Sequence, residues 1–173
     1  VWVLRVKDGI QMHDGSTLTA QDVAYSVSCI FTSEKHKNLQ MQIGRVYSSA
    51  FNGEVYLATE GADNAQLPQR MSIPIIKAGS VGDEIPAGSG PYMYNEDRTA
   101  LVKFDGYENS ESLPLDEVQL RAYRGMEELI TEFESGLVDL VVNDPTGIYN
   151  MGYGGKNEKR VITTTNLHFI GFN

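Results

Sequence analysis

Three histidines are the side chains of this chain that are best suited to acid–base chemistry near neutral pH. His13, His36 and His168 fall in three different predicted elements, and no serine stands in a Gly-x-Ser-x-Gly pattern. That pattern exposes a nucleophile in many hydrolases, and a hydrolase also needs a base and an orienting acid beside it. We therefore expect no enzymatic activity, and we assign His13 a packing role just before a predicted turn.

The residue spacings that are typical of metal-binding and phosphate-binding sites are missing from the sequence. No Cys-x-x-Cys or His-x-x-x-His pair is present, and Asp139 and Asp144 offer only two carboxylates five residues apart. The glycine-rich stretch near Gly88 has neither the Lys-Ser/Thr of a P-loop nor the spacing of a dinucleotide fingerprint. The sequence predicts no metal and no cofactor.

The charge balance excludes several partners. The 173 residues include 14 basic and 23 acidic side chains, for a net charge of −9. Such a chain repels phosphate backbones and anionic lipid surfaces, so we expect no nucleic-acid partner. No apolar run approaches the roughly 20 residues that span a bilayer, so no membrane span is predicted. The single Cys29 has no internal disulfide partner and is expected to be a small core residue.

The first 23 residues predict a strand, a turn and a capped helix. In the segment Trp2 to Lys7, Trp2, Leu4 and Val6 alternate with Val3, Arg5 and Lys7, which is the period of a strand. Asp14-Gly15 is a turn dipeptide, because glycine tolerates positive φ. Thr19 is placed to cap the next helix, and Asp22 stands where a capping box needs an acid. The helix is predicted over residues 20–33 and carries an apolar stripe at Val23, Val27, Ile30 and Phe31.

Further elements follow in order. Asn52-Gly53 between two β-prone runs predicts a hairpin over residues 45–59. Around it we expect a loop or short helix at 34–44, a short helix at 61–71 that contains Leu67, and an extended piece at 73–77. The glycine-rich residues 78–90 have the composition of a linker.

The remainder predicts a second block of helix and sheet. Strands are expected at 92–94, 100–104 and 115–123, a helix at 126–135 that ends at Gly136, and a buried strand at 138–142. The helix should pack its apolar side chains inward, namely Met126, Leu129, Ile130 and Phe133. Strand, helix and strand in this order predict a right-handed parallel crossover.

Several residue strings resemble one family in that family's own order. They are His13-Asp14-Gly15 followed by Ala20-Gln21-Asp22-Val23, then Gly88-Ser-Gly-Pro-Tyr92, Leu113-Pro-Leu-Asp-Glu-Val118, Phe133-Glu-Ser-Gly-Leu-Val-Asp-Leu140 and Phe172-Asn173. The chain resembles family 5 extracellular solute-binding proteins, the peptide- and nickel-capturing subunits of bacterial ABC importers. It departs from the family at Tyr107-Glu108, where relatives often have Tyr-Trp, and at the glycine-rich residues 151–155.

The resemblance implies a fold, a role and a place in the cell. The fold would be α/β with mixed sheets, part of a type II periplasmic-binding-protein-like fold. Residues 1–88 would form a smaller domain and residues 89–173 part of the larger lobe, with the second lobe absent because the chain is a fragment. The implied role is solute capture, with a peptide or similar small solute as ligand and ABC permease subunits as partners. The implied location is extracytoplasmic, in the periplasm or as a cell-surface lipoprotein.

The resemblance also points to one wall of a ligand cleft, formed by Gln69, Ser72, Asn143, Asp144 and His168. The chemistry of Asn143 agrees, because an amide both donates and accepts hydrogen bonds and because ligands bind at strand ends in open α/β sheets. The same Asn-Asp-Pro string is also an ordinary start of a loop.

Two other classes of protein remain as alternatives to solute capture. One is a sensory or regulatory ligand-binding module of the same fold, and the other is a secreted hydrolase. A signal peptide or lipobox cysteine in the gene product would favour import, whereas a helix-turn-helix would favour regulation.

Overall fold

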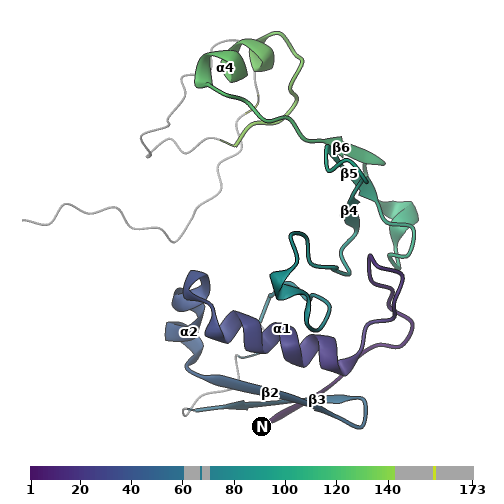
Figure 1. Cartoon of the computed structure of the whole chain (residues 1–173), viewed down its shortest axis with the longest axis vertical. Coiled ribbons are helices and arrows are strands. Elements are labelled where there is room, and N and C mark those ends of the chain that lie inside the picture. Colours follow the sequence, from purple (N-terminus) through teal and green to yellow (C-terminus); the bar gives the residue numbers. More distant parts are fainter. Residues whose placement is uncertain (61–66, 68–70, 143–157, 159–173) are drawn as a thin grey trace, which may run out of the picture. The chain divides into compact units, whose positions relative to one another are not determined.

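The computed structural model describes residues 1–60, 67, 71–142 and 158 (Figure 1). The chain divides into two compact units, Val1–Leu120 and Arg121–Asn173. Among the described residues, no helix has the length and apolar character needed to cross a bilayer. Helices and strands are mixed along the chain, as the sequence predicts.

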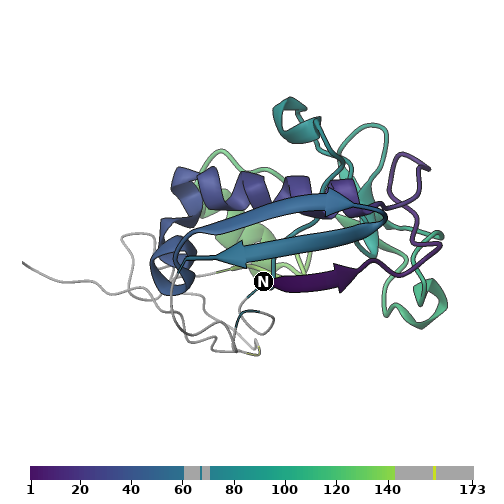
Figure 2. The same cartoon turned by 90° about the horizontal axis from the view of Figure 1, so that it is seen from below.

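The first sheet contains three antiparallel strands in the order β1-β3-β2. They are β1 (Trp2–Arg5), β2 (Val46–Phe51) and β3 (Glu54–Thr59). Helix α1 (Ala20–Thr32) lies across one face of this sheet, as Figure 2 shows. Their shared core consists of Ala20, Ala24, Val27, Val46, Val55, Leu57 and Leu67. The predicted stripe residues Val23 and Phe31 pack against this core while half-buried.

The turn and cap before α1 form as expected. Gly15 has φ +79°, and its amide donates to the Met12 carbonyl at 2.9 Å. The Thr19 hydroxyl accepts a hydrogen bond from the Asp22 amide, and the Asp22 carboxylate accepts one from the Thr19 amide at 2.8 Å. This reciprocal pair satisfies backbone donors that the first turn of a helix leaves free, so it fixes the start of α1.

The hairpin is also confirmed. Phe51 pairs with Glu54, so Asn52 and Gly53 form a two-residue loop with φ +50° and +78°. Positive φ at both positions matches the twist of the flanking strands. The preceding stretch folds as a short 3₁₀ turn, Glu34–His36, and helix α2 (Lys37–Ile43).

Residues 72–91 join the first sheet to the second through extended backbone and turns. Ile76 and Gly88 form an isolated antiparallel bridge, and the Lys77 amide donates to the Ala87 carbonyl at 2.9 Å. These bonds close a loop that contains a 3₁₀ turn, Ser80–Gly82. The short helix predicted at 61–71 lies outside the described residues apart from the helical, buried Leu67 and the half-buried Met71.

The second sheet has the order β4-β5-β6 and is antiparallel. Its strands are β4 (Tyr92–Tyr94), β5 (Ala100–Lys103) and β6 (Glu117–Gln119), so the third is shorter than predicted. Asn95 shapes the turn between the first two, because its side-chain oxygen accepts from the amides of Thr99 and Ala100 at 2.9 and 3.1 Å. The two sheets come from residues before and after the glycine-rich stretch, but a domain boundary at residue 88 remains a prediction.

The second unit is described up to Val142 and at residue 158. Helix α4 (Met126–Glu134) forms where predicted and is followed by Gly136 at φ +78°. Leu129, Ile130 and Phe133 are half-buried, whereas Met126 is exposed. Glu132 ties the helix to the preceding segment, because its carboxylate accepts from the Arg121 guanidinium at 3.1 Å and the Tyr123 hydroxyl at 2.7 Å.

The predicted buried strand at 138–142 is wrong. These residues are irregular, and the side chains of Leu140 and Val142 are 83% and 90% exposed. A strand is stable only when a neighbour accepts and donates its backbone hydrogen bonds, and no described strand pairs with this segment. The parallel crossover that depended on the strand is therefore also not formed in the described part of the chain.

The turn before α1 provides a direct test of this backbone geometry. We expect Gly15→Val to lower the free energy of unfolding by about 1–3 kcal/mol, because a β-branched residue is strained at positive φ. A β-carbon at Gly15 would meet no atom within 4 Å, so the cost comes from the backbone alone. Urea denaturation measures it. Gly82→Val is the matched control, since Gly82 has equally open surroundings without positive φ; equal stability of the two variants would contradict the turn.

The buried Asp22 carboxylate predicts a specific dependence of stability on pH. Although burial opposes its ionisation, hydrogen bonds from Thr19 and Ala78 and the charge of Lys77 hold the pKa of Asp22 below its ordinary value of 3.8. A lowered pKa stabilises the fold above pH 3.8, and this contribution is lost as the pH falls through the folded-state value.

We therefore expect the stability difference between the wild type and Asp22→Asn to be largest near pH 6 and to shrink below pH 3.8. Near pH 6 the asparagine should cost about 1–3 kcal/mol, because its amide nitrogen replaces one carboxylate oxygen, so that the amide of Thr19 or of Ala78 loses its acceptor. Chemical denaturation at a series of pH values measures the difference. Asp8→Asn removes an exposed carboxylate and serves as control; the same pH profile for both variants would rule out the assigned role of Asp22.

Candidate functional site

The structure describes one of the five residues predicted to face a cleft. Ser72 is exposed on irregular backbone just before Ile73, which packs against the core of the first sheet. The other four, Gln69, Asn143, Asp144 and His168, lie outside the described residues. Ser72 is therefore the only member of the predicted wall that the structure locates, and the grouping of the five remains a prediction.

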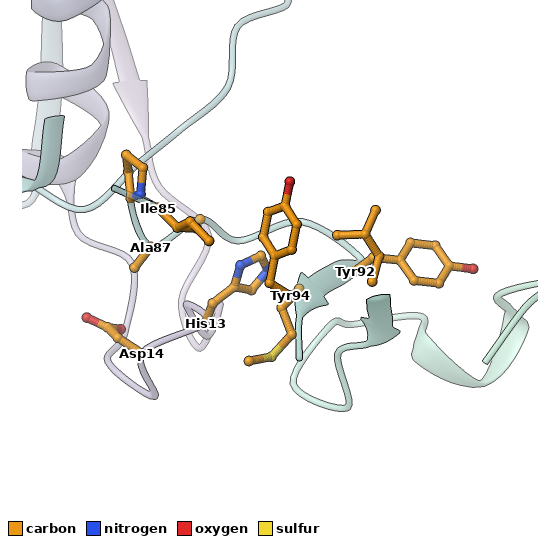
Figure 3. Close-up of a pocket in the computed structure, with 10 residues that line it drawn as sticks. His13, Asp14, Ile85, Ala87, Tyr92 and Tyr94 are labelled. Atoms are coloured by element: carbon orange, nitrogen blue, oxygen red, sulfur yellow. The ribbon is translucent and has the colours of Figure 1, made fainter. Parts of the chain in front are cut away.

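A pocket of about 340 Å³ lies beside His13 in the first unit (Figure 3). One wall is the loop 85–88 and another is formed by β4 and Leu101 of β5. Tyr94 and His13 both line the pocket in Figure 3, and the Tyr92 hydroxyl donates to the Leu115 carbonyl at 2.9 Å. Most of the lining is apolar, and its polar side chains are His13, Asp14 and the two tyrosines.

His13 is occupied by contacts with the backbone and with an aromatic ring. Its amide donates to the Gly88 carbonyl at 2.8 Å, and its ring Nε2 donates to the Gly90 carbonyl at 3.0 Å. The ring also meets Phe104 edge to face, with centroids 4.9 Å apart. A β-carbon at Gly88 would lie 3.5 Å from the His13 ring, so the loop passes close to it. These contacts support the packing role that the sequence predicts for His13.

Ser16 and Lys77 form a pair that resembles a serine–lysine dyad. The Lys77 ammonium donates to the Ser16 hydroxyl at 2.8 Å, and this hydroxyl donates to Asp14 at 2.6 Å. A catalytic dyad needs a base that removes the serine proton. Here the serine donates its proton to Asp14, and the hydrogen bonds from Ser16 lower the pKa of Asp14, which makes its carboxylate a weak base. The arrangement therefore stabilises the turn rather than activating a nucleophile.

Metal chemistry finds no support in the described residues. Among them, no group of three or more histidine, cysteine, aspartate or glutamate side chains could hold a metal ion. Asp139 is described and exposed, but Asp144, the other half of the pair noted in the sequence, lies outside the described residues.

The sequence patterns missed two buried polar side chains of α1. Asp22 and Ser26 are each 1% exposed. The sequence patterns predicted burial only for the apolar stripe of this helix. The Ser26 oxygen accepts from the Ile76 amide at 2.9 Å, and the Asp22 carboxylate accepts from the Ala78 amide at 2.8 Å. The available signal is their spacing of four residues, which places two polar side chains on one helix face.

The chain belongs to the bacterial extracellular solute-binding proteins of family 5, since the family model "Bacterial extracellular solute-binding proteins, family 5 Middle" matches residues 1–173. This family consists of extracytoplasmic binding proteins that are typically not enzymes. No curated protein matches the chain significantly.

Solved structures show the same fold at low sequence identity. The ABC transporter substrate binding protein CtaP from Listeria monocytogenes is 23% identical, with a TM-score of 0.57 over 79% of this chain and 32% of its own. The oligopeptide-binding protein AppA from Bacillus subtilis, solved with a nonapeptide, is 21% identical, with a TM-score of 0.57 over 79% and 31%. NikA from Staphylococcus aureus, solved with Ni(L-His)2, is 22% identical, with a TM-score of 0.56 over 79% and 30%.

These likenesses confirm the fold class. The mixture of helices and sheets corresponds to part of a type II periplasmic-binding-protein fold. The chain spans about a third of the length of each of these solved structures.

The contacts of His13 give a testable distinction between packing and hydrogen bonding. We expect His13→Phe to lower the free energy of unfolding by about 0.5–1.5 kcal/mol, because it removes the bond to Gly90 but can keep the aromatic edge against Phe104. His13→Ala removes both and should cost more. Urea denaturation of the two variants measures the difference. Equal losses would show that the ring contact with Phe104 contributes nothing.

Proposed function

We propose that this chain is part of the substrate-binding protein of an ABC importer that captures peptides or a similar small solute. The observation that carries the proposal is the match of the family model over residues 1–173. Solved relatives that bind a nonapeptide and a nickel–histidine complex support the same class of role. The ligand of this chain is proposed at the level of a peptide or similarly small solute.

Capture in this class of protein works as a hinged clamp. Ligand that bridges two lobes favours the closed form over the open form, and the closed form docks on the permease. Such a protein needs differential affinity for the ligand in the two forms, and it needs no covalent chemistry. In this proposal the chain supplies one wall of the clamp, in an extracytoplasmic protein of the periplasm or of the cell surface.

The wall itself is proposed to include Gln69, Ser72, Asn143, Asp144 and His168. Exposure of Ser72 supports its place there, because the residue lies at the surface and a serine hydroxyl can both donate and accept a hydrogen bond. The argument from strand ends no longer supports Asn143 and Asp144, since residues 138–142 form no strand. Their place in the wall rests on the resemblance to the family.

The proposal also keeps the division into two domains. Residues 1–88 would form the smaller domain and residues 89–173 part of the ligand-binding lobe. The first sheet uses strands from residues 2–59 and the second uses strands from residues 92–119, which is compatible with a boundary in the glycine-rich stretch between them.

Calorimetric titration of two proteins, this chain and the gene product that contains it, tests the proposal. The probes are a mixed peptide library and Ni(L-His)2. We expect the gene product to bind one of them with micromolar or tighter affinity, at about −8 kcal/mol or better. This chain alone should bind with a dissociation constant in the millimolar range or weaker. One wall supplies only part of the contacts, whereas the ligand loses nearly the same translational and rotational freedom on binding.

The two titrations separate two ways in which the proposal can fail. A gene product that binds neither a peptide nor the nickel complex would contradict the proposed ligand class. A micromolar isotherm with this chain alone would instead show that its residues form a complete site, which contradicts the single-wall arrangement.

A further inference from the structure

One face of α1 is directed at backbone rather than at other side chains. Asp22, Tyr25 and Ser26 follow the spacing of a single helix face. The Asp22 carboxylate accepts from the Ala78 amide at 2.8 Å, the Tyr25 hydroxyl from the Val81 amide at 3.3 Å, and the Ser26 hydroxyl from the Ile76 amide at 2.9 Å. We call these three side chains the polar face of α1.

The Ser26 hydroxyl lies within hydrogen-bond distance of three backbone groups. Its oxygen accepts from the Ile76 amide, and it also lies 3.1 Å from the Ile76 carbonyl and 2.7 Å from the Asp22 carbonyl. The residue is 1% exposed, so water has little access to these groups. Without this hydroxyl, the Ile76 amide would lose the acceptor that the structure gives it, and a buried donor without an acceptor is costly.

The segment held by the polar face of α1 leads in both directions to candidate binding elements. Four residues before Ile76 lies Ser72, the described member of the proposed cleft wall. On the other side, Ile76 forms a β-bridge with Gly88, and the Lys77 amide donates to the Ala87 carbonyl. Ala87 and Gly88 both belong to the pocket wall beside His13. The Gly88 carbonyl in turn accepts from the His13 amide at 2.8 Å.

We propose that Ser26, supported by Asp22 and Tyr25, is a positioning residue for ligand capture: it sets the place of residues 76–81 and thereby of the wall segment that carries Ser72. This inference rests on the proposed function for its consequence in binding. Its structural part stands on the hydrogen bonds alone. Ser26 does not touch the ligand in this arrangement and acts through the backbone that it holds.

A positioning role differs from a general contribution to stability. Val27, the next residue of α1, is also 1% exposed and belongs to the core against the sheet. Val27→Ala should therefore lower stability without releasing Ile76. Ser28→Ala is a second control, because Ser28 is an exposed serine of the same helix.

The first measurement is amide hydrogen exchange followed by NMR on this chain, and it requires no ligand. Exchange at Ile76 is compared with exchange at the amides of β3 in the same sample. In Ser26→Ala we expect this ratio to rise by about tenfold or more, which corresponds to the loss of one hydrogen bond. Tyr25→Phe removes only the acceptor of Val81, so it should raise exchange at Val81 and leave the fold intact. Neither control should raise the ratio at Ile76: Ser28→Ala should leave it as in the wild type, and Val27→Ala should raise exchange at β3 at least as much as at Ile76.

The second measurement is calorimetric titration of the gene product with the peptide library and Ni(L-His)2, at a temperature where every variant is folded. Ser26→Ala should weaken the affinity for the bound probe by about tenfold, while Val27→Ala and Ser28→Ala should not. An unchanged exchange ratio at Ile76 would overturn the inference. A raised ratio with unchanged affinity would overturn the positioning role.

A wild type that binds neither probe would contradict the proposed function and with it the binding role of Ser26. The exchange ratios would still decide whether Ser26 fixes the position of residues 76–81.

Discussion

The buried carboxylate of Asp22 is the interaction on which much of the first unit depends. It is 1% exposed and accepts hydrogen bonds from the amide and hydroxyl of Thr19 and from the amide of Ala78. A buried charge is tolerated only when its hydrogen-bonding capacity is used and an opposite charge is near, and Lys77 lies 3.9 Å away. One side chain thus fixes the first turn of α1 and the position of a segment 56 residues further along.

This arrangement makes α1 a link between two different kinds of neighbour. Its apolar side packs on the sheet through Ala24 and Val27, where shape and area count more than direction. Its polar face meets backbone groups of residues 76–81, where direction and distance count. The sheet therefore determines where the helix lies, and the helix determines where the segment lies. The segment then borders both Ser72 and the loop beside His13.

Features that depend on near neighbours were predictable from the sequence. The turn at Gly15, the capping box of Thr19 and Asp22, and the loop at Asn52-Gly53 each need only a few adjacent residues, and each is present. The strand at 138–142 was predicted from its apolar character and was wrong, because a strand also needs a partner that the local sequence does not specify. Burial of Ser26 likewise depends on backbone fifty residues away. For the site, residue types and family motifs identified five candidates, but of these the structure locates only Ser72.

The antiparallel register has a consequence for the order in which the first sheet assembles. Strands β2 and β3 are separated by two residues, whereas Trp2 of β1 pairs with Leu57 across more than fifty residues of chain. Closing a short loop is fast, and a hairpin forms in about 1–10 μs, while a distant pairing must first overcome the entropy of a long loop. Of these three strands β1 leaves the ribosome first, and its partner in this sheet, β3, is complete only after residue 57 has emerged. The strand made first is therefore the last of the three to be paired.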